Sequence, residues 1–271
     1  MPIAKLFIEG NLESEVLSRI LQGTPLLVQG GSKDSLKPRA RAERRDNQVA
    51  AGYLRDRDFD FDPPVDLSKP TVDCEDAAIP FGWRWCRHET ENYLIDPVVV
   101  KEATGWPVLE VEEAIRQSAR RISDYEAARW TVGIVRRALP PHYEMRTRPE
   151  GLSDIGLPLA LDPTTVGAWA SDNIERHRGQ IVTVTDPVAV QQSFGDFTDR
   201  FNDAFVEDVA SVLLWFSGKD ILAGMSEWLV TRNVANPGAF RALLRDWIIA
   251  NPERSLELLP EWHGMTEVLR A

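Results

Sequence analysis

The chain has 271 residues, a formal net charge of −11 and a hydrophobic content of 43%. It is long enough to bury a full core, and its composition is ordinary for a globular protein. The acidic balance argues against a general nucleic-acid coat protein, which is usually basic, but not against an enzyme that meets phosphates through metal ions. Two cysteines make no C-x-x-C pair and no disulfide framework. Without an apolar run long enough for a signal peptide or a membrane span, we expect a cytoplasmic protein with no membrane partner.

The first sixty residues alternate between short apolar runs and amphipathic segments. We predict strands over residues 3–9, 24–29 and 50–54. Helices are expected over residues 12–21 and after the turn at residues 30–32. This alternation predicts a parallel sheet with right-handed crossovers, the α/β class.

The third predicted strand runs into aspartates at every second position, Asp56, Asp58, Asp60 and Asp62. Alternate residues of a strand point to one face, so Asp56 and Asp58 should face the same way at the strand's C-terminal end. Glu9 ends the first strand, and the ligand sites of open α/β sheets lie at this edge. Carboxylates that converge there repel one another unless a cation lies between them, and hard oxygen ligands suit Mg²⁺ or Mn²⁺. The pattern therefore predicts a metal site.

The aspartate run has two other interpretations. An EF-hand calcium loop needs Gly at its sixth position. Counting from Asp56 places Phe61 there. Counting from Asp58 places Pro63 there, so neither register gives an EF-hand. A solvated acidic turn is the second alternative, and it is the rest of the chain that argues against it.

Beyond the aspartates, residues 63–82 carry four prolines and are predicted as a loop, with a fourth strand at residues 83–86. The chain then becomes mainly helical. One helix is expected at residues 111–122, and a capping box at Ser123–Glu126 predicts the start of another. Residues 142–162, rich in Pro and Gly, are expected to form a loop or lid. Further helices are predicted at residues 163–178, 196–214, 220–231, 237–250 and 255–269.

A basic cluster lies between the second and third predicted strands. Its candidates for contact with nucleic-acid phosphates are Arg39, Arg41, Arg44 and Arg45. The alternative is an ordinary solvated helix face. The position of the cluster, on the segment that leads to the aspartates, is what makes it a candidate.

Four short motifs carry a resemblance to a known family. FIEGNLE at residues 7–13, followed by DRD at residues 56–58, resembles the Toprim signature of an acid and glycine after strand one and an Asp-x-Asp after strand three. RHETENYL at residues 87–94 is similar to the R-x-E-x-E-N-Y-L segment of Toprim proteins related to the OLD (overcoming lysogenization defect) nucleases. FSGKDIL at residues 216–222 is similar to their late G-K-x-L-L segment. Within the third motif, His88 alone is more typical of a hydrogen-bonded structural histidine than of a metal ligand.

The resemblance implies a Toprim-like parallel sheet flanked by helices, followed by a mainly helical C-terminal region. We accordingly expect a catalytic core over residues 1–100 and a helical region over residues 101–271 that carries the late Gly-Lys motif. Described members of the family are metal-dependent nucleases, often in bacterial anti-phage defence and often paired with an ABC-type ATPase. This chain has no ATPase motif, so the resemblance implies a separate ATPase partner, and it allows for a homo-oligomer. Relatives usually carry Asp where this chain has Glu13, which shifts that carboxylate by one methylene.

The activity implied is hydrolysis of phosphodiester bonds in DNA or RNA with two Mg²⁺ or Mn²⁺ ions about 3.5–4 Å apart. Glu9 is expected to bind metal and to act as the general base. Lys219 is expected to neutralise charge on the phosphate, with an ordinary surface lysine as the alternative. The expected metal ligands are Glu9, Glu13, Asp56, Asp58, Asp60 and Glu91.

Other Toprim enzymes fit the chain less well. A topoisomerase needs a further domain with a nucleophilic tyrosine, and bacterial primases add a zinc-binding module for which two cysteines are too few. The main alternative from another class is a non-catalytic Toprim subunit that binds and regulates an ATPase partner. The intact set of Glu9, Asp56 and Asp58 favours the enzyme.

Overall fold

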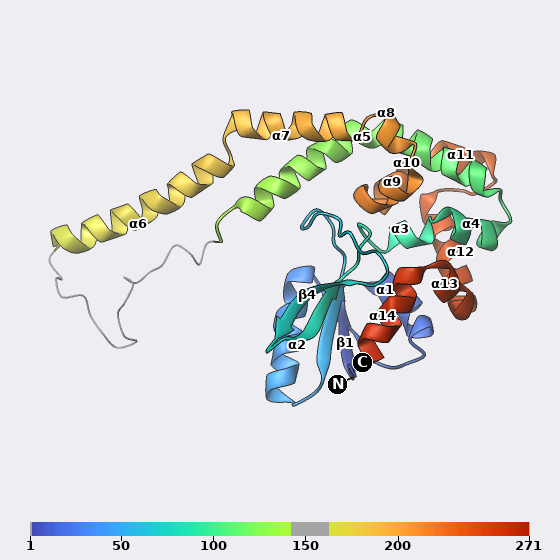
Figure 1. Cartoon of the computed structure of the whole chain (residues 1–271), viewed down its shortest axis with the longest axis horizontal. Coiled ribbons are helices and arrows are strands. Elements are labelled where there is room, and N and C mark those ends of the chain that lie inside the picture. The colour runs from blue at the N-terminus through green and yellow to red at the C-terminus, as the bar shows by residue number, and fades with distance from the viewer. Residues whose placement is uncertain (1, 142–162, 271) are drawn as a thin grey trace. The chain divides into compact units, whose positions relative to one another are not determined.

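The computed structural model of the chain describes residues 2–141 and 163–270 (Figure 1). Contacts divide the chain into two compact units: residues 1–126 with 201–271 form unit 1, and residues 127–200 form unit 2. The boundary expected at residue 100 falls inside unit 1, within the helix Pro97–Thr104. The reason is that helices from beyond residue 200 pack back against helices of the first hundred residues.

Unit 1 contains a five-stranded sheet of order β2-β1-β3-β5-β4. Neighbouring strands are parallel, except that β4 and β5 form an antiparallel pair. The α/β class predicted from the sequence is therefore confirmed. The strands and the first two helices are β1 (Lys5–Ile8), α1 (Asn11–Ile20), β2 (Leu26–Gln29), α2 (Lys33–Asp46), β3 (Ala51–Arg55), β4 (Thr71–Asp76) and β5 (Ile79–Arg84).

The β4–β5 hairpin corrects the prediction of a loop over residues 63–82. Pro80 lies within β5, where it faces only β4, because the pairing of β5 with β3 begins at Gly82. A missing N–H is tolerated at such a position, outside the central ladder. The strand predicted at residues 83–86 exists, but it begins at Ile79 and ends at Arg84.

The order of the first three strands creates a switch point in the sheet. The chain crosses from β1 to β2 on one side and then returns past β1 to β3. Right-handed crossovers in opposite directions place α1 and α2 on opposite faces of the sheet (Figure 1). On one face, Leu36 and Ala40 of α2 pack against Phe7, Tyr53 and Phe81. Open α/β sheets bind ligands at the carboxyl edge of such a switch point, here between β1 and β3.

The remaining regular elements that the structure describes are helices. Among the described residues, none is long and apolar enough to cross a membrane. The helices are α3 (Glu91–Leu94), α4 (Pro97–Thr104), α5 (Val108–Ala138), α6 (Pro163–Val184), α7 (Pro187–Arg200), α8 (Asp203–Val206), α9 (Val209–Trp215), α10 (Gly218–Gly224), α11 (Ser226–Thr231), α12 (Pro237–Ala250), α13 (Pro252–Leu258) and α14 (Pro260–Arg270). The described part of unit 2 contains the end of α5, α6 and α7.

Several predicted helix boundaries are wrong for local reasons. The break predicted at Ser123 does not occur, because its hydroxyl donates to the Arg120 carbonyl within α5 (3.2 Å), so α5 is a single helix of 31 residues. The helix predicted at residues 196–214 is divided among α7, α8 and α9, since Asn202 and Asp208 cap new helices.

Other helix predictions have mixed outcomes. The helices predicted at residues 220–231 and 255–269 are each two, α10 with α11 and α13 with α14. The prediction for residues 237–250 is confirmed as α12, and α6 extends six residues beyond its predicted end, from residue 178 to Val184. The loop or lid expected at residues 142–162 lies outside the described residues.

A buried aromatic cluster fixes the segment that follows β5. The rings of Trp85, Tyr93 and Trp262 lie with centroids 5.2–6.2 Å apart. Beside them, the buried Glu261 of α14 accepts hydrogen bonds from the Cys86 N–H (2.7 Å) and from the Tyr93 hydroxyl. The last helix is thereby joined to the residues between β5 and α3.

The pairing of β3 with β5 generates a stability prediction. Tyr53 lies opposite Gly82, and a Cβ at Gly82 would lie 2.3 Å from two ring atoms of Tyr53. That ring cannot easily move, because its hydroxyl donates to Asp73. Gly82→Ala should therefore lower the free energy of unfolding by roughly 1–3 kcal/mol, measured by urea denaturation. In a Tyr53→Ala background the same substitution should be nearly neutral; an equal loss in both backgrounds would show that the ring is not the cause.

Candidate functional site

Acidic residues follow β1 and β3 at the carboxyl edge of the sheet. The Glu9 Oε1 atom accepts a hydrogen bond from the backbone N–H of Asp56 at 3.1 Å. Glu13, in the first turn of α1, accepts one from the Gly10 N–H at 2.9 Å. Gly10 is the N-cap of α1, so the helix starts directly after the strand and places Glu13 close enough to act on Glu9 through its charge. The structure brings these three acids together, as the motifs predicted.

The turn after β5 adds a fourth acid to this group. The N–H and hydroxyl of Thr90 both donate to Asp56 Oδ1, at 3.1 and 3.3 Å. Next in the chain, Glu91 forms ion pairs with Arg241 of α12 (3.1 Å) and with Lys219 (3.5 Å). Glu91 therefore joins the site through a turn whose position depends on Asp56.

The late Gly-Lys motif packs directly onto the same turn. The Glu89 Oε1 atom accepts hydrogen bonds from the Ser217 hydroxyl and the Lys219 N–H, both at 2.8 Å, across 128 and 130 residues of chain. The Lys219 ammonium lies 2.6 Å from Glu89 Oε2. A Cβ at Gly218 would lie 2.6 Å from the Asn92 backbone nitrogen, so only glycine allows this close approach. The motif folds over the sheet edge, where Lys219 was expected.

One cavity of about 380 Å³ unites these groups. Four carboxylates line it together with the cationic side chains of Lys219 and Arg241. Burial lowers the pKa of Lys219, but the charges of Glu89 and Glu91 raise it by more. The pKa of Lys219 is therefore raised overall, and its ammonium group stays charged. The acids that line the cavity are Glu9, Glu13, Asp56 and Glu91.

The acids of the cavity hold their protons more tightly than ordinary carboxyl groups. Burial first, and then the nearby Asp58 and Glu13, raises the pKa of Glu9 to about 7. Burial and the Glu13 charge raise the pKa of Asp56 well above its usual value. Burial is also the main reason why the pKa values of Glu13 and Glu91 are raised. A divalent cation among these groups would offset both the lost hydration of the buried carboxylates and the repulsion between them.

Asp58 and Asp60 take other positions. β3 ends at Arg55, and Asp58 has a left-handed backbone with φ of 49°. The argument that Asp56 and Asp58 share one strand face is therefore wrong, although Asp58 still acts on Glu9 through its charge. Lys33, at the start of α2, pairs with Asp58 (2.8 Å) and with Asp60 (2.6 Å). Asp60 also pairs with Arg55 (3.1 Å), and it does not line the cavity.

Arg57, which lies between Asp56 and Asp58, has a structural role that was not predicted from the sequence. The Arg57 side chain is fully buried. It donates to the carbonyl oxygens of Cys86 (2.9 Å) and Phe61 (2.5 Å). It also donates to the Leu214 carbonyl of α9. Burial lowers its pKa to about 10, so it remains charged at neutral pH. Arg57 thus fixes the turn over residues 56–62 against two other segments.

The arginines proposed for nucleic-acid contact lie elsewhere. Arg44 donates to the carbonyl of Ala51, at the start of β3 and thus at the opposite edge of the sheet (3.0 Å). It lies eleven residues beyond Lys33 along α2, which is about 16 Å of helix. Arg41 and Arg44 cover the Phe81 ring, Arg45 pairs with Asp46, and Arg39 is exposed. The structure does not bring these arginines to the carboxylates, and their role stays a prediction.

Several residues at the site were not expected from the sequence. They come from four separate segments of unit 1. Glu89 had a usable signal, since it alternates with Glu91 in the RHETENYL motif, whereas Arg241 stands in an unremarkable helix. The unexpected residues are Lys33, His88, Glu89, Thr90, Ser217 and Arg241.

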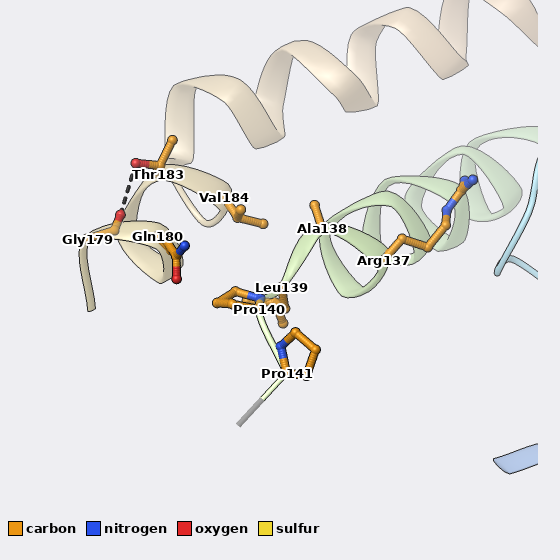
Figure 2. A pocket seen from close by; sticks show the side chains of 9 residues that line it. All are labelled: Arg137, Ala138, Leu139, Pro140, Pro141, Gly179, Gln180, Thr183 and Val184. Carbon is orange, nitrogen blue, oxygen red and sulfur yellow. Dashed lines mark hydrogen bonds between the residues drawn. The ribbon is translucent and has the colours of Figure 1, made fainter. Parts of the chain in front are cut away.

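A larger cavity occurs in unit 2, but its lining does not suit a metal ion. It measures about 620 Å³ and lies between the end of α5 and the last turns of α6 (Figure 2). Its described lining includes Arg137 and apolar or neutral residues such as Leu139 and Val184, and no carboxylate. The Thr183 hydroxyl donates within α6 to the Gly179 carbonyl (2.9 Å). We therefore place the candidate site in unit 1.

The chain matches no protein-family model, and no curated protein is significantly similar to it. The assignment of the site therefore rests on its geometry. The donor set itself fits hard divalent ions: the cavity offers oxygen ligands, and burial and mutual repulsion raise the pKa values of Glu9 and Asp56.

The raised pKa of Glu9 predicts that stability falls as pH rises. An acid whose pKa increases from 4.5 to about 7 on folding binds its proton more tightly in the folded state. That stabilisation is present below about pH 4.5 and is lost as pH rises through 7. The loss from this partly exposed group should be of order 2 kcal/mol, and Glu13, Asp56 and Glu91 act in the same direction.

The measurement is thermal melting in EDTA between pH 4.5 and 8. The melting temperature should fall across this range, less steeply in Glu9→Gln, and Mg²⁺ should flatten the fall because it binds the ionised acids. Glu253→Gln, on the exposed surface of α13, is the matched control and should keep the wild-type slope. A flat wild-type profile in EDTA would contradict the repulsion argued here.

Proposed function

We propose that this chain is a divalent-metal-dependent nuclease that hydrolyses phosphodiester bonds of DNA or RNA. The observation that carries the proposal is the single cavity in which four carboxylates meet Lys219 and Arg241. Carboxylates supply ligands for metal, while the two cations provide a place for an anionic substrate. A volume of about 380 Å³ is within the ordinary range for a ligand site. The Toprim resemblance of the motifs points to the same chemistry.

The chain's own residues have separable tasks in this reaction. Two divalent ions, when bound, would activate a water molecule and stabilise charge on the phosphate and the leaving oxygen. Glu9 lines the cavity beside Asp56 and would accept a proton from the attacking water. Glu9, Glu13, Asp56 and Glu91 would hold the metal ions, with Asp58 beside them.

Lys219 and Arg241 are suited to hold phosphate oxygens. The Lys219 side chain is 55% exposed, although its ammonium group pairs with Glu89. It can therefore turn toward a phosphate without leaving a buried site. Arg241 offers a planar group that can donate two hydrogen bonds to one phosphate. In the structure both cations neutralise Glu91, so a bound metal ion would release them for substrate.

A second candidate function is a non-catalytic subunit that regulates an ATPase partner. The observation that favours it is that Lys33 and Lys219 already neutralise Asp58 and Glu89 without a metal ion. A permanently neutralised acidic site would have a structural role. The raised pKa values of Glu9 and Asp56 favour the enzyme, because their hydrogen bonds do not offset burial and the repulsion from neighbouring carboxylates.

We further propose that the nuclease is the effector of an anti-phage defence system and works with a separate ABC-type ATPase. The support is the resemblance of the motifs, together with a net charge of −11 that gives weak general attraction to nucleic acid. The turn at residues 30–32 between β2 and α2 lacks the spacing of a nucleotide-binding loop.

Glu9→Gln should separate catalysis from structure. It keeps the side-chain volume and removes the charge, so cleavage of labelled plasmid, single-stranded DNA and tRNA in Mn²⁺ should fall about a hundredfold or more. The melting temperature of the same sample at neutral pH should stay equal or rise, because a repulsive charge is gone. Glu253→Gln is the control and should cleave at the wild-type rate. Full activity in Glu9→Gln would remove the proposed active site.

The partner proposal has its own test. The pure chain should cleave slowly, and the rate should rise when the ATPase that co-purifies with it is added together with ATP. The reason is that an acidic chain captures nucleic acid poorly by charge alone. Full-rate cleavage by the chain alone, with no response to any co-purifying ATPase, would contradict the need for a partner.

A further inference from the structure

Beside the carboxylate cavity lies a second group of ligand atoms, and this one includes a histidine. One ligand atom from each of Asp58, His88 and Glu89 lies within 4.8 Å of the other two. None of the three is among the residues that line the cavity. They come from two segments, the turn after β3 and the turn after β5. Because an imidazole nitrogen joins the two carboxylates, the chemistry differs from that of the oxygen-only cavity.

The two segments are held together by backbone and packing contacts. The Asp58 N–H donates to the His88 carbonyl at 2.8 Å. The Phe59 ring packs edge-on against the His88 imidazole, with centroids 4.3 Å apart and planes at 69°. His88 and Glu89 are buried, with 1% and 4% of their surface exposed. The ring position is therefore fixed by its surroundings, unlike that of a side chain in a flexible surface cluster.

The spacing of the three atoms is close to that of a metal site. Bonds of about 2.0–2.2 Å to one ion place neighbouring ligand atoms about 3.0–3.5 Å apart, so three atoms within 4.8 Å of one another need to move only a short way toward a bound ion. A metal ion could approach this group from the side of Asp58, because the Asp58 side chain is 27% exposed whereas His88 and Glu89 are buried. Imidazole nitrogen suits first-row transition metals better than Mg²⁺.

We propose that Asp58, His88 and Glu89 bind a first-row divalent transition metal, such as Mn²⁺, in preference to Mg²⁺. The inference deepens the proposed nuclease function and rests on it in one respect, since Asp58 also acts on Glu9 of the cavity. The protein would then hold one ion among oxygen ligands and a second with a nitrogen ligand. Its activity would be higher with Mn²⁺ than with Mg²⁺ as the only metal.

Two lysines occupy the positions of counterions in this group. Lys33 lies 2.8 Å from Asp58 Oδ2, and Lys219 lies 2.6 Å from Glu89 Oε2. Each ammonium group neutralises one carboxylate of the site. A dication would share both carboxylates with these lysines, so removing one lysine should favour the metal. Lys33→Met should accordingly bind Mn²⁺ more tightly than the wild type in calorimetry.

Pulsed electron paramagnetic resonance of Mn²⁺ bound to the full chain tests the site. The wild type should show ¹⁴N modulation from a directly bound imidazole, and ¹⁵N-labelled histidine should change it to the ¹⁵N pattern. His88→Ala should lose the modulation and bind Mn²⁺ at least about tenfold more weakly at that site. His263→Ala, an exposed histidine of α14, is the matched control and should keep both. Because the labelling uses wild-type protein, the test holds even where His88→Ala folds poorly.

The outcomes separate this site from the nuclease activity. Absence of nitrogen modulation in wild type, or its persistence in a folded His88→Ala, would overturn the proposal. Weaker Mn²⁺ binding in Lys33→Met than in the wild type would also count against it. Nitrogen modulation in a protein without cleavage activity would support this metal site and contradict only the proposed nuclease.

Discussion

The repulsion among carboxylates at one edge of the sheet is the constraint on which the rest of the site depends. Glu9, Glu13, Asp56 and Glu91 are too close and too buried to ionise independently, as their raised pKa values show. Backbone N–H donors at residues 10, 56 and 90 offset part of this repulsion. Natural proteins keep such locally unfavourable arrangements where function requires them. Here the unfavourable arrangement is a group of buried carboxylates whose charges a metal ion would neutralise.

The site needs parts of the chain that lie far apart in sequence. β1 and β3 supply the first acids because parallel strands end at the same edge. The segment after β5 and the Gly-Lys motif of α10 supply the rest, and Asn92 joins them by donating to the Phe216 carbonyl (2.9 Å) and accepting from the Gly218 N–H (3.1 Å). Arg57 adds a third junction, to α9. The helices after residue 200 are thus part of the site and not an appended region.

Sequence reasoning recovered what depends on local periodicity and on the geometry of parallel sheets. The strand–helix alternation, and the meeting of Glu9 with Asp56, follow from such rules. The hairpin was missed because Pro70 before it and Pro80 within β5 are typical of a loop. The aspartate turn was predicted wrongly because the left-handed backbone at Asp58 has no sequence signal. Arg57, Arg241 and the closeness of His88 to Asp58 result from tertiary packing. A single sequence carries no rule that would place them.

The contact between α14 and the segment after β5 has a consequence for biosynthesis. Glu261 satisfies the Cys86 N–H and the Tyr93 hydroxyl, two groups that flank the turn carrying Glu89 and Glu91. That acceptor is separated from Cys86 by 175 residues of chain and from Tyr93 by 168. A growing chain that has not yet reached Glu261 therefore carries the acids of this turn but lacks the contact that positions them. The order of synthesis thus places the acids before the support that fixes their geometry.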